Sequence, residues 1–366
     1  MTADLRSTID PNAYSNPMQT DGFEFVEYAT DDPQAMDQLF RQLGFTVIAS
    51  HKSKQVTLYR QGDINFILNS EPDSFAEAFA RMHGPSANAM AFRVKDAAAA
   101  ISRARALGAE IVDARNNPSE LNIPAIRGIG GSLLYLVDKY GEAGSIYDHD
   151  FDYLPDVDRH PEGVGLSYLD HLTHNVHRGN MDKWAGFYEK FFNFRQIRYF
   201  DIEGRLTGLK SRAMTSPCGR IRIPINESVD DKSQIEEFLH EYKGEGIQHI
   251  ALGAADIYHS VELMQQAGMS FLDTPDTYYE KIEERLPDHG EPLELLKKFR
   301  ILVDGAPDSA PGKGDGGLLL QIFTKTVIGP IFFEIIQRKG DEGFGEGNFR
   351  ALFESIEEDQ VRRGVL

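Results

Sequence analysis

Cysteine is nearly absent from this sequence, in which one residue, Cys218, occurs among 366. A single thiol cannot build a disulfide framework, and it cannot supply a cysteine-based zinc site. The chain also contains no apolar run that approaches the ~20 residues of a membrane-spanning helix. Its first residues lack the apolar stretch of a secretory signal peptide. These absences predict a cytoplasmic protein with no membrane contact.

Basic residues are also scarce relative to acidic ones. The 38 lysines and arginines are outnumbered by 57 aspartates and glutamates, which gives a formal net charge of -19. This charge disfavours binding to nucleic acid and to anionic membranes, so we expect neither as a partner. The remaining composition is that of a globular protein, with 41% hydrophobic and 10% aromatic residues. At this length, two or three domains are expected.

One arrangement of predicted elements recurs along the chain. A strand is followed by a helix, whose first turn is capped by Asp or Asn, and then by further strands. In the first half we predict strands at 23–29, 45–48, 55–59, 64–68, 89–94, 110–113 and 132–137, and helices at 34–43 and 97–107. In the second half we predict strands at 169–176, 246–252, 318–323 and 331–336, and helices at 181–192, 257–267 and 349–363.

This repetition predicts an α+β fold in which four βαβββ modules pair into two half-barrel-like domains. Residues 1–19 are expected to be a flexible N-terminus, and 20–150 an N-terminal, non-catalytic domain. A linker rich in Asp, Pro and Gly is expected at 151–165. Residues 166–366 are then a C-terminal catalytic domain that contains a metal site and ends in an amphipathic helix.

Three residues in the second half stand out as candidate metal ligands. Glu334 lies in a short apolar strand, where a carboxylate needs either a buried cation or a metal. His171 and His249 lie in two other predicted strands, each about one module from the next candidate. Two imidazoles and one carboxylate are the ligand set of non-haem Fe(II) oxygenases, although zinc or manganese also fits.

Structural roles compete with this interpretation. A single histidine is more often a hydrogen-bonded structural residue than a ligand, and His174 and His177 lie in the same segment as His171. The repeat offers a comparison, because the first half carries Glu24 and Ala89 or Met90 near the places of the two candidate histidines. Histidines needed only for the fold would occur in both halves, so the chemistry is expected in the second half.

Four strings in the second half resemble the 4-hydroxyphenylpyruvate dioxygenases, which have the vicinal-oxygen-chelate fold. These strings are DHLTHNV at 170–176, GIQHIAL at 246–252, FFEIIQR at 332–338 and GFGEGNF at 343–349. The resemblance implies one Fe(II) per chain, held by His171, His249 and Glu334. It implies an aromatic 2-oxo acid substrate, O2 and the product homogentisate. No haem, flavin, nicotinamide or 2-oxoglutarate is implied.

The resemblance also implies positions for the substrate. Polar contacts to the ring hydroxyl or the channel are carried over to Ser211, Asn226, Gln234, Gln248 and Gln321, and aromatic walls to Phe323, Phe332 and Phe349. A lid or gate over the site is carried over to Phe344, Asn348 and Phe349. Considered without the resemblance, the phenylalanines are core residues and the amides are surface or turn residues.

Three alternatives remain at this point. A 4-hydroxymandelate synthase uses the same substrate and iron but oxidises the benzylic carbon, and Asn226 and Phe332 favour ring hydroxylation instead. A metal-dependent isomerase or ring-cleaving dioxygenase of the same fold would not release CO2 from a 2-oxo acid. A non-catalytic binding protein would lack the metal. The metal-free first half is a plausible surface for a homo-oligomer, either a dimer or a tetramer.

Overall fold

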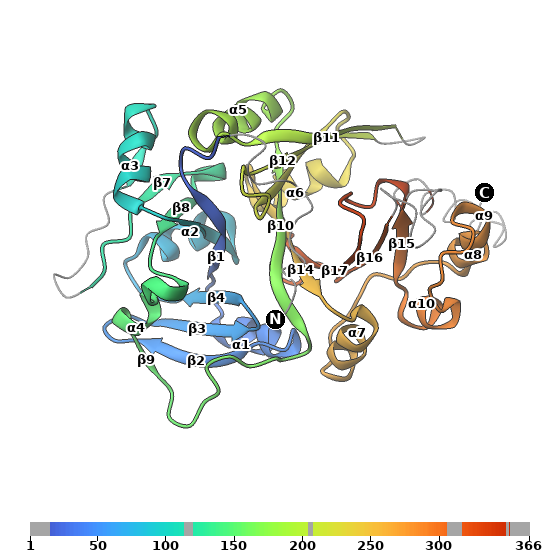
Figure 1. The fold of residues 1–366 in the computed structure, drawn as a ribbon, viewed down its shortest axis with the longest axis horizontal. Helices are drawn as coiled ribbons and strands as arrows, with labels where there is room; N and C mark the ends of the chain where they lie inside the picture. The colour runs from blue at the N-terminus through green and yellow to red at the C-terminus, as the bar shows by residue number, and fades with distance from the viewer. Residues whose placement is uncertain (1–14, 113–119, 204–207, 306–316, 349–350, 352–366) are drawn as a thin grey trace.

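The computed structural model describes residues 15–112, 120–203, 208–305, 317–348 and 351. Residues 1–14 of the predicted N-terminal segment, most of the loop at 305–317 and all of the predicted helix at 349–363 except residue 351 therefore lie outside the described residues. Figure 1 shows a first half, coloured blue to cyan-green, beside a second half, coloured green to red, with the long strand β10 (Leu166–Val176) between them.

The first half contains two βαβββ modules that share one sheet. Its strands run in the order β6-β7-β8-β5-β1-β4-β3-β2-β9. The elements of this half are β1 (Thr20–Ala29), α1 (Pro33–Gln42), β2 (Thr46–His51), β3 (Val56–Gln61), β4 (Ile64–Asn69), α2 (Phe75–His83), β5 (Ser86–Val94), α3 (Ala97–Ala106), β6 (Ile111–Val112), β7 (Ala125–Arg127), β8 (Leu133–Val137), α4 (Ile146–Asp150) and β9 (Phe151–Tyr153).

The second half repeats the same plan. Its sheet runs in the order β11-β12-β13-β10-β14-β17-β16-β15. Its further elements are α5 (Met181–Phe192), β11 (Arg195–Glu203), β12 (Gly208–Thr215), β13 (Arg222–Ser228), α6 (Gln234–Tyr242), β14 (Gly246–Ala254), α7 (Ile257–Gln266), α8 (Asp276–Glu280), α9 (Ile282–Arg285), α10 (Leu293–Phe299), β15 (Leu302–Gly305), β16 (Leu318–Phe323) and β17 (Phe332–Lys339). The predicted α+β fold of four modules is confirmed.

Three of the four predicted helix caps form as expected. The side chains of Asp32, Asp96 and Asp256 each accept a hydrogen bond from a backbone N–H in the first turn of their helix, which satisfies a donor that the helix leaves free. Asn180 precedes α5 but makes no such bond. Its amide instead donates to Glu245 Oε1 at 2.6 Å, so the predicted capping role is wrong.

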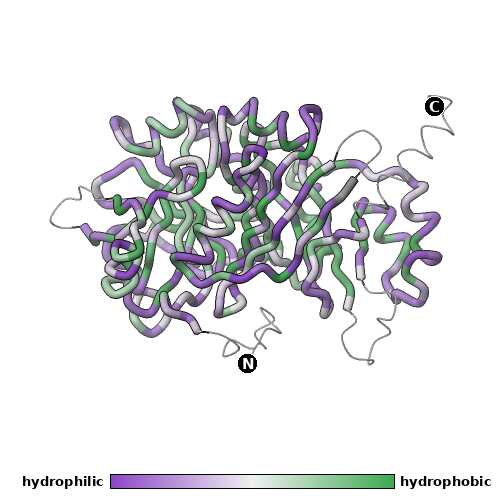
Figure 2. The backbone as a smooth tube through the Cα atoms, turned by 90° about the horizontal axis from the view of Figure 1, so that it is seen from above, coloured by the Kyte–Doolittle hydropathy of each residue, from purple (hydrophilic) through white to green (hydrophobic). Residues whose placement is uncertain are grey.

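The two sheets share one hydrophobic core. Figure 2 shows the apolar segments gathered inside the molecule and the polar segments mostly around its outside. Phe333 on β17 lies 5.9 Å from the Phe66 ring on β4 and 6.5 Å from the Tyr28 ring on β1, which joins the two halves. Side chains alternate along a strand, so Leu172 faces this core while His171 faces the other side of the second sheet.

The predicted linker differs in its first residues. Phe151–Tyr153 form β9, which pairs with β2 at the edge of the first sheet. The strand forms because its partner has an open edge at that point, a property that composition alone does not reveal. No helix in the part of the chain that the structure describes has both the length and the hydropathy to cross a membrane.

Candidate metal centre

Three neighbouring strands bring the candidate ligands together. His171 on β10 pairs across the sheet with Ala251 on β14, and Ala251 pairs in turn with Glu334 on β17. The methyl group of Ala251 leaves room for the two longer side chains to meet above it. His249 lies two residues before Ala251 and therefore shares its face of β14. One ligand atom from each of the three residues lies within 4.8 Å of the others.

The distances in this cluster fit a shared ion. His171 Nε2 lies 3.2 Å from Glu334 Oε2, and His249 Nε2 lies 3.4 Å from the same oxygen. The second carboxylate oxygen, Oε1, is buried and makes no hydrogen bond to any described residue. A buried carboxylate oxygen without a donor is costly, and a cation between the three side chains would remove that cost. The residues therefore fit a metal.

Each histidine is oriented by its sequence neighbour. His171 Nδ1 lies 2.8 Å from Asp170 Oδ1, and His249 Nδ1 lies 2.9 Å from Gln248 Oε1. Because both partners are acceptors, Nδ1 of each imidazole carries a proton, and Nε2, the nitrogen nearest Glu334, is the atom that would bind a metal. Gln248 was predicted to contact substrate. In the structure its Oε1 contacts His249, a candidate metal ligand, and the substrate contact stays a prediction.

Protonation in the cluster favours an anionic carboxylate. Burial acts to raise the pKa of Glu334, but the charge of His171 and hydrogen bonds from both imidazoles lower that pKa to about 2. Burial lowers the pKa of His249. For His171, burial acts in the same direction, yet Glu334 and Asp170 together raise its pKa above the usual value. Glu334 thus supplies a negative charge that a metal cation can neutralise.

A second layer of charge surrounds His171. Arg338 donates from Nε to Asp170 Oδ2 at 2.7 Å and from Nη2 to Asp170 Oδ1 at 2.8 Å. Arg222 lies 3.6 Å from Asp170 and also pairs with Glu342. Burial acts to raise the pKa of Asp170, but these two arginines hold it well below its usual range. Asp170 therefore stays an acceptor for His171.

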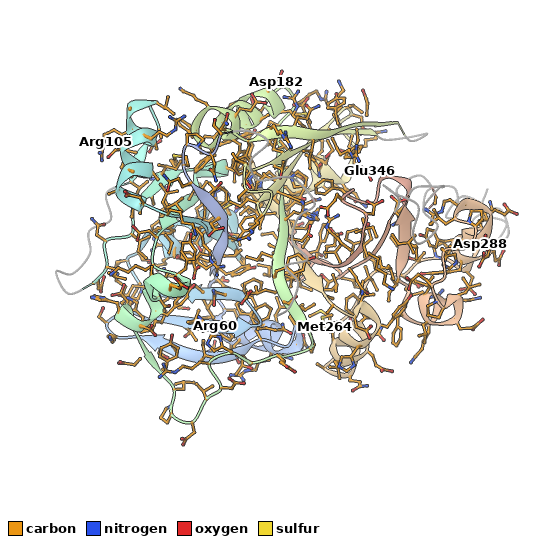
Figure 3. All side chains as sticks on the ribbon, viewed as in Figure 1. Arg60, Arg105, Asp182, Met264, Asp288 and Glu346 are labelled. Carbon is orange, nitrogen blue, oxygen red and sulfur yellow. The ribbon has the colours of Figure 1, made fainter. Side chains whose placement is uncertain are left out.

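The cluster opens into a pocket whose empty space, counted out to the open solvent, is about 500 Å³. Apolar atoms make up most of its exposed surface, as is usual in a small-molecule site, although seven of its twelve lining residues are polar or charged. Glu346, labelled in Figure 3, lies at this pocket in the second half. The full lining consists of His171, Thr173, Phe200, Leu209, Ser211, Pro224, Asn226, His249, Phe323, Glu334, Phe344 and Glu346.

The structure brings part of the predicted substrate set to this pocket. Ser211 and Asn226 are paired across β12 and β13 and both line it, as do Phe323 and Phe344. Phe344 also packs against the His171 ring, with ring centroids 5.3 Å apart. These four predicted residues therefore lie beside the metal cluster, and their contact with substrate stays a prediction.

Other predicted residues lie outside the pocket lining. Phe332 stacks on the His249 ring at 4.8 Å, and the buried Gln321 lies beneath Gly345. Asn348 is buried and its Oδ1 accepts hydrogen bonds from Tyr278 and Arg285, so it anchors the segment rather than facing the pocket. The side chain of Gln234 is exposed on α6. Phe349 lies outside the described residues.

The site predicted from the sequence did not include five of the lining residues. Thr173 is two residues beyond His171 on the same face, so strand alternation could have found it. Phe200, Leu209 and Pro224 lie on β11, β12 and β13, and Glu346 lies in the segment that follows β17. Nothing in their local sequence predicts that these segments meet at the pocket.

The described residues of the first half contain no corresponding cluster. Aligning the strand pairs of the two sheets places Phe25 where His171 stands, Ala89 where His249 stands and Tyr135 where Glu334 stands. Within the ranges that the structure describes, the only group of three potential metal ligands is the one in the second half. Glu24, which the sequence placed near His171, corresponds to Asp170 instead.

Known proteins match both halves of the chain. A family model described as "Hydroxyphenylpyruvate dioxygenase, HPPD, N-terminal" matches residues 14–152. A second, described as "Glyoxalase/Bleomycin resistance protein/Dioxygenase superfamily", matches residues 168–283. The 4-hydroxyphenylpyruvate dioxygenase of Pseudomonas aeruginosa is 61% identical over 354 residues, which cover 96% of this chain and 97% of that protein.

Two further similarities extend this picture. Hemolysin VllY of Vibrio vulnificus is 62% identical over 356 residues, covering 96% of this chain and 98% of that protein. A mutant of 4-hydroxymandelate synthase from Streptomyces coelicolor has a TM-score of 0.77 and 26% identity, covering 93% of this chain and 99% of that one. Because a family model matches the first half and a relative matches nearly the full length, the chain belongs to the 4-hydroxyphenylpyruvate dioxygenase family.

Proposed function

We propose that this protein converts 4-hydroxyphenylpyruvate and O2 to homogentisate and CO2, a step of tyrosine and phenylalanine catabolism. The observation that carries the proposal is the convergence of His171, His249 and Glu334 on one pocket with largely apolar walls. The full-length similarity to the P. aeruginosa dioxygenase supports the same activity.

Iron(II), one ion per chain, is the proposed metal, with His171, His249 and Glu334 as its ligands. Two neutral imidazoles and one carboxylate leave open positions for exogenous ligands, as in non-haem Fe(II) oxygenases. When held by these three residues, iron(II) would supply the Lewis-acid and redox chemistry that binds a 2-oxo acid and activates O2. The substrate itself then supplies the electrons, so haem, flavin, nicotinamide and a separate 2-oxoglutarate are not needed.

Side chains of the protein set the charge, the orientation and the surroundings of the three proposed ligands. Glu334 remains anionic because its pKa lies near 2. Asp170 and Gln248 hold the two imidazoles with Nε2 directed inward. The apolar walls limit water at the metal, which protects a reactive oxidant from side reactions.

Two polar side chains are the proposed partners of the phenol. Ser211 and Asn226 are adjacent on paired strands, and both line the pocket. A hydroxyl and an amide can donate to and accept from the ring hydroxyl. Further substrate contacts are proposed for Gln234, Gln248, Gln321, Phe323, Phe332 and Phe349. Phe344, Asn348 and Phe349 are the proposed lid.

We propose that the two halves of the duplicated fold have different roles. We assign 20–150 to a non-catalytic domain, 151–165 to a linker, and 166–366 to the catalytic domain. The absence of a ligand cluster among the described residues of the first half supports this division. We further propose a cytoplasmic homo-oligomer, dimer or tetramer, assembled through the first half.

The competing activity is that of a 4-hydroxymandelate synthase, which the structural similarity to such an enzyme keeps in consideration. The two activities share substrate and metal, so the product distinguishes them. Iron-loaded protein is incubated with 4-hydroxyphenylpyruvate in air, and the product is identified by mass spectrometry and chromatography against both standards. We expect homogentisate. A main product of 4-hydroxymandelate would overturn the assignment of ring hydroxylation while leaving the metal ligands in place.

A further inference from the structure

The first half has a cavity at the place that the metal pocket occupies in the second half, and we call it the first-half cavity. Its empty space, counted out to the open solvent, is about 690 Å³. The strand pairings of the two sheets show which positions of the two halves correspond. The corresponding lining residues are Phe25 and His171, Glu27 and Thr173, Val56 and Ser211, Ile67 and Pro224, Asn69 and Asn226, and Tyr135 and Glu334. The first half therefore has the same cavity without the metal ligands.

The residues that replace the ligands give this cavity aromatic walls. The Phe25 ring lies 5.6 Å from the Tyr135 ring, and Phe151 adds a third aromatic ring to the lining. Among the described residues of the first half, no group of three potential metal ligands occurs. A metal ion is therefore not the expected occupant, whereas the walls suit the ring of an aromatic ligand.

Glu27 is a buried carboxylate with one oxygen free at this cavity. The residue is 8% exposed, and its Oε1 accepts hydrogen bonds from Asn69 Nδ2 at 2.9 Å and from Asn88 Nδ2 at 2.8 Å. Its Oε2 accepts none from a described residue, yet this oxygen keeps accessible surface, unlike the enclosed Oε1 of Glu334. A buried carboxylate that is bonded only to neutral amides is costly, and burial raises the pKa of Glu27. A cationic donor at Oε2 would offset that cost.

The other charged side chains of the first-half cavity do not supply this cation. Lys54 is the only lysine or arginine among the described lining residues, and its Nζ pairs with Glu120 at 2.6 Å. Asp150 is a third carboxylate of the lining, and it accepts a hydrogen bond from the backbone N–H of Leu121 at 3.1 Å. Burial lowers the pKa of His51, so this imidazole is neutral at neutral pH. Three carboxylates against one lysine give the lining a negative charge, which favours a cationic ligand over an anionic one.

Tyr135 offers a second polar contact close to Glu27. Its hydroxyl makes no hydrogen bond to a described residue and is not among the enclosed polar atoms. Burial raises the pKa of Tyr135, and the charge of Glu27 raises it further, so the two groups are within electrostatic reach of each other. The hydroxyl therefore stays protonated, and its oxygen can accept a hydrogen bond from a ligand.

We propose that the first-half cavity binds a small arylalkylamine, which is a protonated amine with an aromatic ring on a short alkyl arm. The ammonium group would donate a charge-assisted hydrogen bond to Glu27 Oε2 and a second hydrogen bond to the Tyr135 hydroxyl. The ring of the ligand would pack against Phe25 and Phe151. This site is independent of the proposed dioxygenase activity, because none of its residues belongs to the metal centre or its pocket.

The test compares two ligands that differ in one group. At pH 7 the amine of 2-phenylethylamine is protonated, as that of lysine is, whereas 2-phenylethanol has a similar shape and a neutral hydroxyl. Isothermal titration calorimetry of the iron-loaded, full-length protein should show saturable binding of the amine. The alcohol should bind about tenfold more weakly or worse, because only the amine forms the charge-assisted bond. A crystal soaked with the amine should show its nitrogen beside Glu27.

Three variants test the contacts. Glu27→Gln removes the charge with little change in shape, so it should weaken the affinity for the amine by about tenfold or more and leave the affinity for the alcohol nearly unchanged. Tyr135→Phe removes one oxygen and should weaken the affinity for the amine by a smaller factor. Asn226→Ala is the matched control, because it alters the corresponding pocket of the second half, and it should leave the affinity for the amine unchanged.

Several results would overturn the proposal. They are the absence of saturable binding of the amine, equal affinities for the amine and the alcohol, and equal affinities for the amine in the parent and Glu27→Gln proteins. Density for the amine only at the metal pocket would do the same. If Glu27→Gln melts well below the parent protein, the comparison of the two ligands on the parent protein and the soaked crystal decide the question.

Discussion

Arg338 donates two hydrogen bonds, of 2.7 and 2.8 Å, to the carboxylate of Asp170, and Asp170 in turn accepts a hydrogen bond from His171. The same arginine donates from Nη1 to the backbone oxygens of Asp341 and Gly343, at 3.0 and 2.7 Å. One guanidinium therefore connects a candidate metal ligand to the segment that precedes Phe344. Neither the carboxylate nor the segment can shift without disturbing the other.

This connection predicts that Asp170→Asn weakens metal binding. An amide can turn its NH2 toward Nδ1, which removes the charged acceptor and allows the other tautomer. Loss of such a partner typically reduces metal affinity by about 10- to 100-fold. Competition titration with a chelator measures the affinity. Gln248→Leu should have a smaller effect, because the acceptor that it removes is neutral. Equal affinity in parent and Asp170→Asn proteins would contradict this role.

Replacing Arg338 should reduce stability rather than only activity. Arg338→Met leaves a buried carboxylate without its main partner, and breaking a buried pair in this way costs about 3–5 kcal/mol. Denaturant unfolding gives the free energy change. Arg178→Met is the control, because its pair with Asp231 is exposed and should contribute little. Similar unfolding midpoints for the two variants would show that the Arg338 network is not needed for the fold.

The segment that carries Phe344 should tolerate no side chain at Gly345. This glycine has φ +77°, and a Cβ there would lie 1.9 Å from Gln321 Oε1. Gly345→Ala must therefore displace Gln321 or move Phe344, and we expect a higher KM for substrate. Gly290 has φ +73° but open space around a Cβ. Gly290→Ala shares the backbone strain, so an equal rise in KM there would exclude the steric explanation.

His174 predicts how stability depends on pH. It faces the core, and burial lowers its pKa to about 3, against about 6.5 in an unfolded chain. At pH values between these two pKa values, His174 binds a proton in the unfolded state but not in the folded state. The free energy of unfolding should therefore fall as pH drops below 6.5, by up to about 1.4 kcal/mol per pH unit.

His174→Gln should flatten that dependence between pH 7 and 5. The amide can still bond to the Tyr188 hydroxyl, which lies 2.6 Å from His174 Nε2. His177→Gln, at an exposed position nearby, should retain the slope of the parent protein. Urea titrations at several pH values measure the three slopes. Identical slopes in parent and His174→Gln proteins would assign the pH effect to other groups.

Much of the fold could be predicted because each module carries its own local signals. The capping aspartates, Asp32, Asp96 and Asp256, mark helix starts whose hydrogen bonds depend only on neighbouring residues. The strands that carry His249 and Glu334 were also predictable, since they are short apolar runs between turns. These signals are local, and the repeat makes each one visible more than once.

Long-range geometry was harder to predict. Glu24 was expected near the place of His171, but the strand pairings place Phe25 there, a shift of one residue, and both halves have the same irregularity just before that position. Such a shift exchanges the two faces of a strand. Phe200 and Leu209 lie on β11 and β12, and their place at the pocket depends on contacts between distant strands. No local pattern encodes either feature.

The central claim is that one iron ion, held by Glu334 and two histidines, couples O2 to the 2-oxo acid. The most direct test measures O2 uptake, CO2 release and homogentisate together for the iron-loaded parent protein and for Glu334→Gln. His177→Gln is the control, because it changes an exposed histidine outside the metal centre. We predict that the parent and control proteins consume O2 and form CO2 and homogentisate in equal amounts. Glu334→Gln should neither retain iron nor turn over substrate. Unchanged iron content and turnover in Glu334→Gln would contradict the account.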